Sequence, residues 1–464
     1  MFATTIYKNR RAQLISMVGQ GVIVLLGNDL VGMNYLDNTY PFRQDSSFLY
    51  FCGVNRPGFA VLLDCNTGEE FLAGPEQTLS EVIWSGPRPS LAHWAQKSGL
   101  AHWGSFDQLA HTLNQVQATT RPVHYLPPYR GEHVLKLASL LGLGPAEVEK
   151  NISVPLIKAV VALRSVKTGA EVHEIRQAIA LSQQLYALLM THCQPGITEQ
   201  ELYGRLQGFV LAQGSQEAFP TILTRRGQVL HNHTRDQVLA QGDLLLVDSG
   251  VCSKEGYGSD ITRTLPVNGT FSSRQQDIYE IVLAAQAAGC AKIAPGVPFV
   301  DCHLAAARTV TQGLKDLGLM RGDPDDAVRA GAHALFFPHG LGHMLGLDTH
   351  DMENLGEDYV GYDQTFKRSS QFGLAGLRLA HQLQSGFVVT VEPGIYFIPA
   401  LITQWQAEKK LDAFIHYQAL EDYMDFGGIR IEDDILVTEQ GFENLSHNIP
   451  KNITELCGAM GQRS

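Results

Sequence analysis

The chain has 464 residues, and 44% of them are hydrophobic. This length predicts two or three domains, and the composition is typical of a globular protein with a sizeable core. The formal net charge of −12 at pH 7 argues against nucleic acid or an anionic membrane as the main partner.

The seven cysteines indicate a reducing compartment. Their number is odd and no two have Cys-x-x-Cys spacing, which argues against a disulfide framework or a cysteine zinc site. No apolar run approaches the roughly 20 residues that a membrane-spanning helix needs. No signal-peptide core follows the basic residues near the N-terminus. We therefore expect a cytoplasmic protein with reduced thiols.

The first third of the chain is predicted to form an α/β domain. Three apolar runs are predicted to be strands, namely 21–27 (GVIVLLG), 59–64 (FAVLLD) and 81–84 (EVIW). Polar stretches with helical patterns lie between them. A change of pattern near Pro155 predicts a boundary, so we expect one domain at 1–158 and a second at 159–464.

The second domain contains an internal repeat. A helix is predicted over 171–193 and stops at Pro195-Gly196, and a similar helix about a hundred residues later stops at Pro295-Gly296. Another helix follows each Pro-Gly pair. An apolar run that ends in an acid and a tight turn comes next, as LLLVDSG at 244–250 and VVTVEPG at 388–394. The matching order predicts two related halves.

Four acidic residues lie in or beside apolar, strand-like runs, and they are Asp248, Asp260, Glu392 and Glu432. The runs that contain the two aspartates are predicted to pair as a hairpin and bring them together. A buried isolated carboxylate costs about several kcal/mol or becomes neutral. Edge positions in water, or salt bridges to Arg263 and Arg430, would explain one such acid. A shared cation better explains all four.

The segment 337–351, FPHGLGHMLGLDTHD, carries three histidines. His339 and His343 have the i, i+4 spacing of a helical zinc site, but three glycines within seven residues disfavour a helix. Four carboxylates with one imidazole suit Mn²⁺, Co²⁺, Fe²⁺ or a catalytic Zn²⁺ rather than a structural zinc. Their four negative charges predict two metal ions, which together can activate a water molecule.

The order of these residues resembles a known dinuclear centre. Asp248, Asp260, His343, Glu392 and Glu432 resemble the five ligands of the pita-bread metallopeptidases (family M24), which include methionine aminopeptidase, aminopeptidase P and prolidase. The motifs VDSG, SDITRT, HGLGHMLGLDTHD, TVEPGIY and GIRIEDD resemble the proline-specific branch. YPFRQDSSFLYFCGVNRPG at 40–58 is similar to the aminopeptidase P and prolidase N-terminal domain, and EVIWSGPRP at 81–89 to that of aminopeptidase P.

The resemblance implies a fold and a cofactor. The fold would be α/β (α+β), with an N-terminal α/β domain and a catalytic pita-bread (creatinase/aminopeptidase) domain of pseudo-twofold halves. Two divalent metal ions are implied, Mn²⁺ above all, with Co²⁺, Zn²⁺ or Fe²⁺ as alternatives. Asp248, Asp260 and Glu432 would hold one ion, and Asp260, His343, Glu392 and Glu432 would complete the pair. Homodimers or homotetramers are implied as well.

The resemblance also implies roles for residues around the metal ligands. The implied catalytic residues are His231, His339, His350, Glu392 and Arg430, and the implied substrate-binding residues are His231, His339, His350, Arg378 and Arg430. Glu392 would be both a ligand and a proton carrier, and His233 would be a bystander. The alternatives are a surface position or hydrogen bonding alone for the histidines, and a simple salt bridge for Arg430.

The implied activity is hydrolysis of the Xaa-Pro bond at the free N-terminus of a peptide, by an Xaa-Pro aminopeptidase. Proline lacks an N–H and its ring fixes φ, so this bond calls for a dedicated pocket. An Xaa-Pro dipeptidase is the alternative, favoured by Arg378 and by a long insertion at 399–427, which is predicted to be helical and close to the site. A metal-free peptide-binding relative is a remote alternative, because all five ligand types are present.

Overall fold

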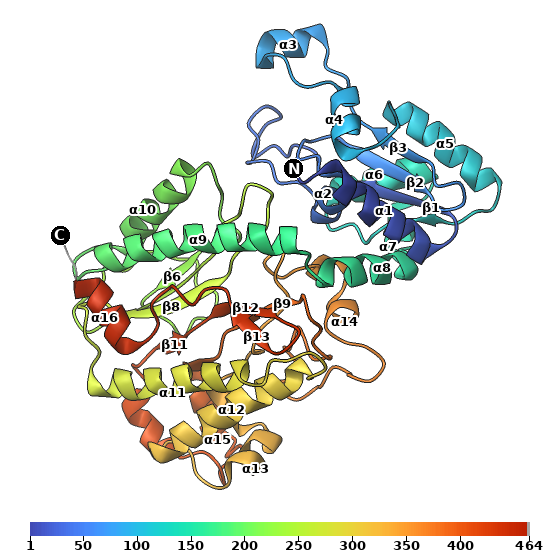
Figure 1. The fold of residues 1–464 in the computed structure, drawn as a ribbon. Coiled ribbons are helices and arrows are strands. Elements are labelled where there is room, and N and C mark those ends of the chain that lie inside the picture. The colour runs from blue at the N-terminus through green and yellow to red at the C-terminus, as the bar shows by residue number, and fades with distance from the viewer. Residues whose placement is uncertain (462–464) are drawn as a thin grey trace. The chain divides into compact units, whose positions relative to one another are not determined.

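The computed structural model describes residues 1–461, which form two compact units (Figure 1). Unit 1 contains residues 1–164 and the short later segment Asn354–Tyr359, and unit 2 contains the rest of the described chain. The domain boundary after residue 158 stays a prediction.

Unit 1 is built on a five-stranded sheet with the order β4-β3-β2-β1-β5. The strands are β1 (Val22–Leu26), β2 (Ala60–Asp64), β3 (Glu70–Ala73), β4 (His102–Gly104) and β5 (Val123–His124). The three central strands are antiparallel, and the two edge strands pair in parallel with their neighbours. Every residue of β1 and β2 is buried, which confirms the strands predicted at 21–27 and 59–64.

Helices cover this sheet and close its core. They are α1 (Thr4–Val18), α2 (Ser46–Cys52), α4 (Leu91–Ser98), α5 (Phe106–Ala118), α6 (Gly131–Leu141), α7 (Pro145–Lys150) and α8 (Val154–Ser165), whereas α3 (Leu79–Ser85) lies apart from the core. Leu109 and Leu113 of α5 and Leu137 of α6 pack with Val24 and Leu62 of the sheet in one hydrophobic cluster. The i, i+4 spacing of the two α5 leucines places both on one helix face.

The strand predicted at 81–84 is wrong, because this segment belongs to helix α3. The Thr78 side chain accepts a hydrogen bond from the Glu81 amide, and the Glu81 side chain accepts one from the Thr78 amide, which is a complete capping box. No residue of α3 is buried, and Trp84 is 85% exposed. Figure 1 shows α3 standing clear of the other elements of unit 1. Its apolar residues therefore belong to a helix on the surface of unit 1.

Unit 2 contains two small sheets and a two-stranded ribbon. The first sheet, with the order β6-β7-β8, consists of β6 (Ile222–Thr224), β7 (Leu244–Ser249) and β8 (Ile261–Pro266). The second, with the order β13-β12-β9, consists of β9 (Val388–Val391), β12 (Asp433–Val437) and β13 (Phe442–Asn444), and the ribbon consists of β10 (Gly394–Tyr396) and β11 (Gly428–Arg430). A bridge between Thr262 and Glu432 joins the two halves.

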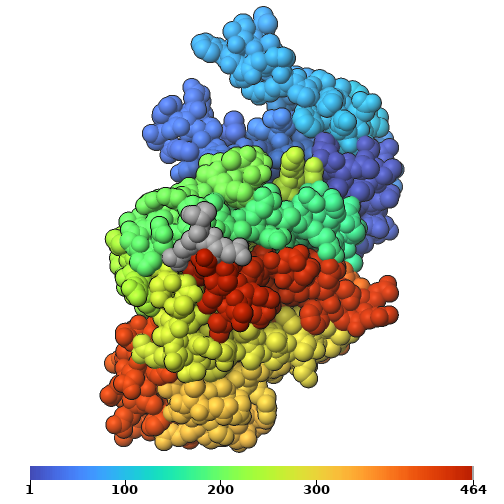
Figure 2. Space-filling view, turned by 60° about the vertical axis from the view of Figure 1, so that its left-hand side comes forward, coloured from blue at the N-terminus to red at the C-terminus, as the bar shows by residue number. Residues whose placement is uncertain are grey.

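Helices flank these strands on two sides (Figure 1). They are α9 (Gly169–His192), α10 (Glu199–Ala212), α11 (Ser273–Cys290), α12 (Phe299–Asp316), α13 (Pro324–Ala330), α15 (Pro399–Ala407) and α16 (Ile453–Gly461), with 3₁₀ turns at Ala332–Leu335 and Tyr417–Tyr423. The 3₁₀ turn Glu353–Leu355 and α14 (Glu357–Val360) fall largely in the later segment of unit 1. The C-terminal elements, red in Figure 2, lie beside the green segment that contains α9, on which α16 packs.

The chain order of unit 2 confirms two related halves. A helix pair (α9 and α10) precedes the sheet that contains β7 and β8, and a second pair (α11 and α12) precedes the sheet that contains β9 and β12. The insertion 399–427 is helical as predicted, with α15 and the 3₁₀ turn Tyr417–Tyr423. Within residues 1–461, no helix is both long enough and apolar enough to cross a membrane.

Candidate metal centre

The β7–β8 hairpin brings the two aspartates together. The strands are antiparallel, and Asp248 on β7 lies opposite Thr262 on β8. Asp260 precedes Thr262 by two residues, and because side chains alternate along a strand, Asp260 points to the same face as Thr262. The predicted pairing of these two segments is confirmed.

The second half of unit 2 supplies the two glutamates. Glu392 directly follows β9, and Glu432 lies between β11 and β12, at the bridge to Thr262. The Thr262 hydroxyl donates a hydrogen bond to the Glu432 carboxylate over 2.6 Å. Glu432 is only 1% exposed, so the apolar run around it lies in the buried interior. Glu432 is therefore not at an edge-strand position with its side chain in water.

His343 reaches the acids from a loop that is not helical, as its glycines predicted. A Cβ atom at Gly342 would lie 2.0 Å from the Thr390 carbonyl oxygen, so only glycine allows the loop to approach β9 this closely. The His343 amide donates to the Thr390 hydroxyl over 3.1 Å. These contacts hold His343 beside β9.

The hydrogen bonds of His343 define its tautomer. Its Nδ1 lies 3.0 Å from the Met344 carbonyl oxygen, which only accepts, so Nδ1 carries the proton. Burial lowers the pKa of His343 well below its usual value and keeps the ring neutral. Nε2 therefore presents a lone pair, and it lies 3.3 Å from Asp260 Oδ2 and 3.6 Å from Glu392 Oε1.

This donor set fits a divalent cation. A lone pair that faces two carboxylates is repulsive unless a positive charge lies between them. Asp260, His343 and Glu432 offer ligand atoms that all lie within 4.8 Å of one another. Asp248 Oδ1 is buried and has no hydrogen-bond partner in the described part of the chain, so it is also available to a cation.

Burial and mutual repulsion act on the pKa values of the acids in the same direction. Desolvation, followed by the charges of neighbouring carboxylates, raises the pKa of Asp260 and of Glu432 well above the usual values. Burial likewise raises the pKa of Glu392 to about 8. Such a cluster holds its negative charge at neutral pH only when cations compensate it.

Of the two arginines that could have paired with the four acids, Arg430 pairs with one of them and Arg263 pairs elsewhere. Arg263 donates to Asp433 over 2.7 Å, and both side chains are fully buried. Arg430 Nη2 lies 2.7 Å from Asp248 Oδ2. Salt bridges therefore account for one oxygen of Asp248 and leave Asp260, Glu392 and Glu432 to other partners.

Tyr396 links Arg430 to His339. Arg430 Nη1 donates to the Tyr396 hydroxyl over 3.0 Å, and the hydroxyl donates to His339 Nε2 over 2.9 Å. His339 Nδ1 donates to the Gly340 carbonyl over 2.8 Å. Burial lowers the pKa of His339 to about 3, so the ring is neutral. Tyr396 stands in the TVEPGIY motif, but no spacing rule singled it out.

His350 and Arg378 meet at a residue that the sequence did not indicate. Glu353 Oε2 lies 2.7 Å from His350 Nδ1, and Glu353 Oε1 accepts a hydrogen bond from Arg378. The hydrogen bond from His350, assisted by Arg378, lowers the pKa of Glu353 to about 2, so its carboxylate is charged. The rings of His350 and His343 are 4.4 Å apart.

All the predicted site residues line one cavity of about 310 Å³, a volume typical of ligand sites. The metal-ligand candidates in its wall are Asp248, Asp260, His343, Glu392 and Glu432, and the other predicted residues are His231, His339, His350, Arg378 and Arg430. His233 lines it too, so placement alone does not separate His233 from His231. Phe219, Pro220, Ile222 and Leu230 add an apolar wall.

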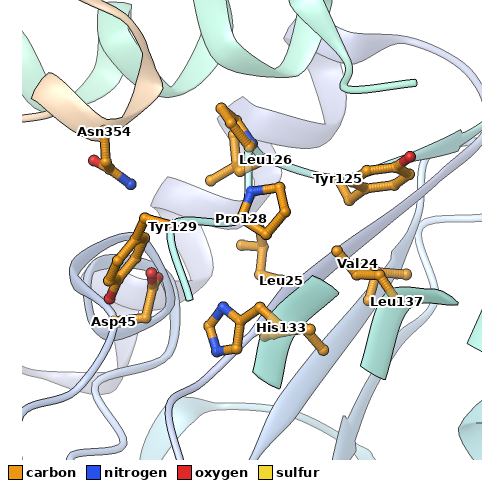
Figure 3. Close-up of a pocket in the computed structure, with 12 residues that line it drawn as sticks. Val24, Leu25, Asp45, Tyr125, Leu126, Pro128, Tyr129, His133, Leu137 and Asn354 are labelled. Atoms are coloured by element: carbon orange, nitrogen blue, oxygen red, sulfur yellow. The ribbon is translucent and has the colours of Figure 1, made fainter. Parts of the chain in front are cut away.

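Unit 1 has a much smaller cavity of about 30 Å³, shown in Figure 3. Asp45, Tyr129 and His133 line it, together with Asn354 from the later segment of unit 1. A cavity needs only about 10 to 15 Å³ to hold one water molecule. This cavity is therefore too small for a dipeptide.

A two-halved β core around one imidazole and four carboxylates, three of them buried, defines a metallohydrolase. The profile of metallopeptidase family M24 matches residues 173–439, and that of the aminopeptidase P N-terminal domain matches residues 7–124. The chain belongs to metallopeptidase family M24, in the part of it that contains Xaa-Pro peptidases.

Relatives with both specificities are similar over most of the chain. Human Xaa-Pro dipeptidase is 32% identical over 95% of this chain and 88% of its own. A probable Xaa-Pro aminopeptidase of Fusarium vanettenii is 34% identical over 90% of this chain and 88% of its own. Among solved structures, proline aminopeptidase P II of Yersinia pestis covers 99% of this chain and 100% of its own with a TM-score of 0.81 and 28% identity.

Proposed function

We propose that this chain is an Xaa-Pro aminopeptidase, which hydrolyses the bond between the first residue and a proline in second position. The observation that carries the proposal is the convergence of the five candidate ligands, four further histidines and two arginines in the wall of one cavity. The similarity of both parts of the chain to aminopeptidase P supports it. The intact donor set argues against a metal-free binding protein.

We propose that the five ligands hold two divalent metal ions, with Mn²⁺ expected and Co²⁺, Zn²⁺ or Fe²⁺ as alternatives. Asp248, Asp260 and Glu432 would hold one ion, and Asp260, His343, Glu392 and Glu432 would complete the pair. When bound, such ions polarise a carbonyl and make water a nucleophile at neutral pH. Hard oxygen donors with a single imidazole match this set of metals.

The residues around the ligands would position the substrate. His231, in the cavity wall, would donate to the carbonyl oxygen as charge develops on it. Glu392 would carry a proton to the leaving proline nitrogen, a role that suits a carboxyl whose pKa burial raises to about 8. His339, a neutral donor-acceptor held by Tyr396, and His350 would line the substrate side.

One observation favours the second candidate, an Xaa-Pro dipeptidase. A dipeptide carries a free carboxylate next to the scissile bond, and Arg378 is a cation in the cavity wall. Arginine binds carboxylates in a bidentate way. This residue therefore makes dipeptide hydrolysis a specific alternative and defines the comparison that separates the two.

The test compares Ala-Pro with Ala-Pro-Ala, with Ala-Ala-Ala as the control that lacks proline. Purified protein would be stripped with EDTA and then loaded with Mn²⁺, Co²⁺ or Zn²⁺ in parallel. Release of alanine from Ala-Pro-Ala, absent after EDTA and restored by metal, is the expected result. Cleavage confined to Ala-Pro would make the chain a dipeptidase, and no cleavage with any metal would refute both.

We also propose a homodimer or homotetramer in the cytoplasm, as the family resemblance implies. Light scattering coupled to gel filtration measures the mass directly, and a mass near the 50.9 kDa of one chain would contradict an oligomer. Fractionation of cells that express the chain tests the compartment. The seven cysteines, none of which forms a disulfide, are compatible with a reducing one.

A further inference from the structure

The further inference concerns Glu353, a carboxylate beside the cavity that none of the proposed steps uses. Only two arginines line the cavity within the described residues, and Arg430 is 4% exposed and bound to Asp248 and Tyr396. Arg378 is more accessible, because 31% of its side chain is exposed. A free carboxylate on a substrate would therefore meet the charge of Arg378.

Glu353 already pairs with this guanidinium. Its Oε1 accepts from Arg378 Nη1, and its Oε2 lies 2.7 Å from His350 Nδ1. Arg378 and His350 both line the cavity, whereas Glu353 is not part of the lining. The carboxylate thus contacts both side chains from outside the cavity lining. Its negative charge offsets the positive charge of Arg378.

The backbone directs Glu353 toward this position. Met352 is buried and has a φ of 65°, which a residue other than glycine rarely adopts. This turn lets the Glu353 amide donate to the His350 carbonyl over 3.2 Å, and Glu353 then begins a 3₁₀ turn. A backbone conformation that costs free energy persists because the surrounding contacts hold it.

We propose that Glu353 biases the enzyme toward peptides longer than a dipeptide, by neutralising the arginine that a free Xaa-Pro carboxylate would bind. In a longer peptide the proline carbonyl continues into a neutral amide, which needs no counter-charge. In a dipeptide that group is a carboxylate, which must compete with Glu353 for Arg378. The inference rests on the proposed Xaa-Pro peptidase activity and concerns its choice of substrate length.

The test replaces Glu353 with Gln, which keeps the shape and removes the charge. The substrates are Ala-Pro and its amide, Ala-Pro-NH₂, which differ only in the carboxylate. We expect E353Q to raise kcat/KM for Ala-Pro about fivefold relative to Ala-Pro-NH₂ at low salt, mainly through KM, since ion pairs of this exposure are worth up to about that factor. High salt should shrink the gain, because it screens the released charge.

Two further variants make the test specific. D358N removes one negative charge from an exposed side chain five residues away, and it should leave the ratio of Ala-Pro to Ala-Pro-NH₂ unchanged. In the double variant E353Q/R378M the gain should vanish, because the cation is gone. Glu353→Ser provides a second measurement of the lost charge should E353Q not fold.

Three results would overturn the inference. The first is an unchanged ratio of kcat/KM for Ala-Pro to that for Ala-Pro-NH₂ in E353Q. The second is a fall in this ratio, which would show that Glu353 only holds Arg378 ready for a carboxylate. The third is a gain that persists in E353Q/R378M. Each of them requires that the wild type cleaves at least one of the two substrates. Failure of the wild type on both would instead refute the proposed function, so the two failures are distinguishable.

Discussion

Arg430 and Asp248 lie 182 positions apart in the chain, yet Arg430 Nη2 and Asp248 Oδ2 are 2.7 Å apart in a buried pair. The same guanidinium donates to Tyr396 and to Thr262. One side chain thereby connects a candidate ligand from the first half of unit 2 with residues around the second half. The other oxygen of Asp248 has no hydrogen-bond partner among residues 1–461.

Removal of this connection should impair the site more than the fold around it. We expect R430M to lower kcat/KM by about 10- to 100-fold, because residues that orient metal ligands typically contribute that much. Metal affinity should fall with it, as measured by isothermal titration of EDTA-treated protein. R176M is the matched control, since Arg176 and Glu443 form an exposed pair, and it should change activity less than about twofold. Normal metal affinity and activity in R430M would contradict this role.

His343 should be needed for metal retention. We expect H343A to lose bound metal and activity together, because its Nε2 lone pair faces Asp260 and Glu392 with no proton of its own. Metal content by plasma mass spectrometry measures the effect. H447A is the control, because His447 is an exposed histidine of the same unit. Equal metal content in H343A and wild type would show that His343 is not a ligand.

Tyr396 should act through its hydroxyl alone. We expect Y396F to lower kcat/KM by about tenfold, close to the value of one hydrogen bond in a buried network, because His339 loses its donor and Arg430 loses an acceptor. Y279F removes a comparable hydroxyl that bonds to the Lys451 carbonyl. This control should cost about 1 kcal/mol of stability and leave kcat/KM unchanged. A loss of activity as large in Y279F would reduce the Tyr396 effect to a general loss of stability.

Two buried histidines should weaken the fold in acid. The rings of His303 and His333 lie 6.0 Å apart, and none of their nitrogens has a hydrogen-bond partner among the residues that the structure describes. Burial lowers the pKa of His333 from 6.5 to about 4. Between these values the unfolded chain binds a proton that the folded protein does not, so the stabilisation is complete above about pH 6.5 and decreases as the pH falls.

The measurement is urea unfolding of wild type and H333L between pH 4.5 and 7.5. We expect the wild type to lose up to about 3 kcal/mol more than the variant across the window, since one pKa unit is worth about 1.4 kcal/mol. Titration of the metal ligands is common to both proteins and cancels in the difference. Parallel stability curves would show that His333 does not contribute to the acid sensitivity.

Much of the site could be predicted because its residues lie in short, distinctive runs. An acid at the end of an apolar strand is recognisable in one dimension, and so is a glycine-rich loop around a histidine. The proximity of Asp248 and Asp260 could be predicted because an antiparallel hairpin has a simple register. The same reasoning failed for 81–84 (EVIW), where the apolar residues predicted a buried strand. Thr78 and Glu81 form a capping box there, which begins helix α3 instead.

The sequence by itself determined the order of the five candidate ligands, the two related halves and the non-helical histidine loop, because strand periodicity and glycine content are local properties. Only the tertiary structure decided which partner each charge takes. Arg263 pairs with Asp433, Arg430 with Asp248, and Glu353 with Arg378. Such pairs depend on side chains that meet in space after folding, and separation along the chain does not encode which of several acids an arginine will reach.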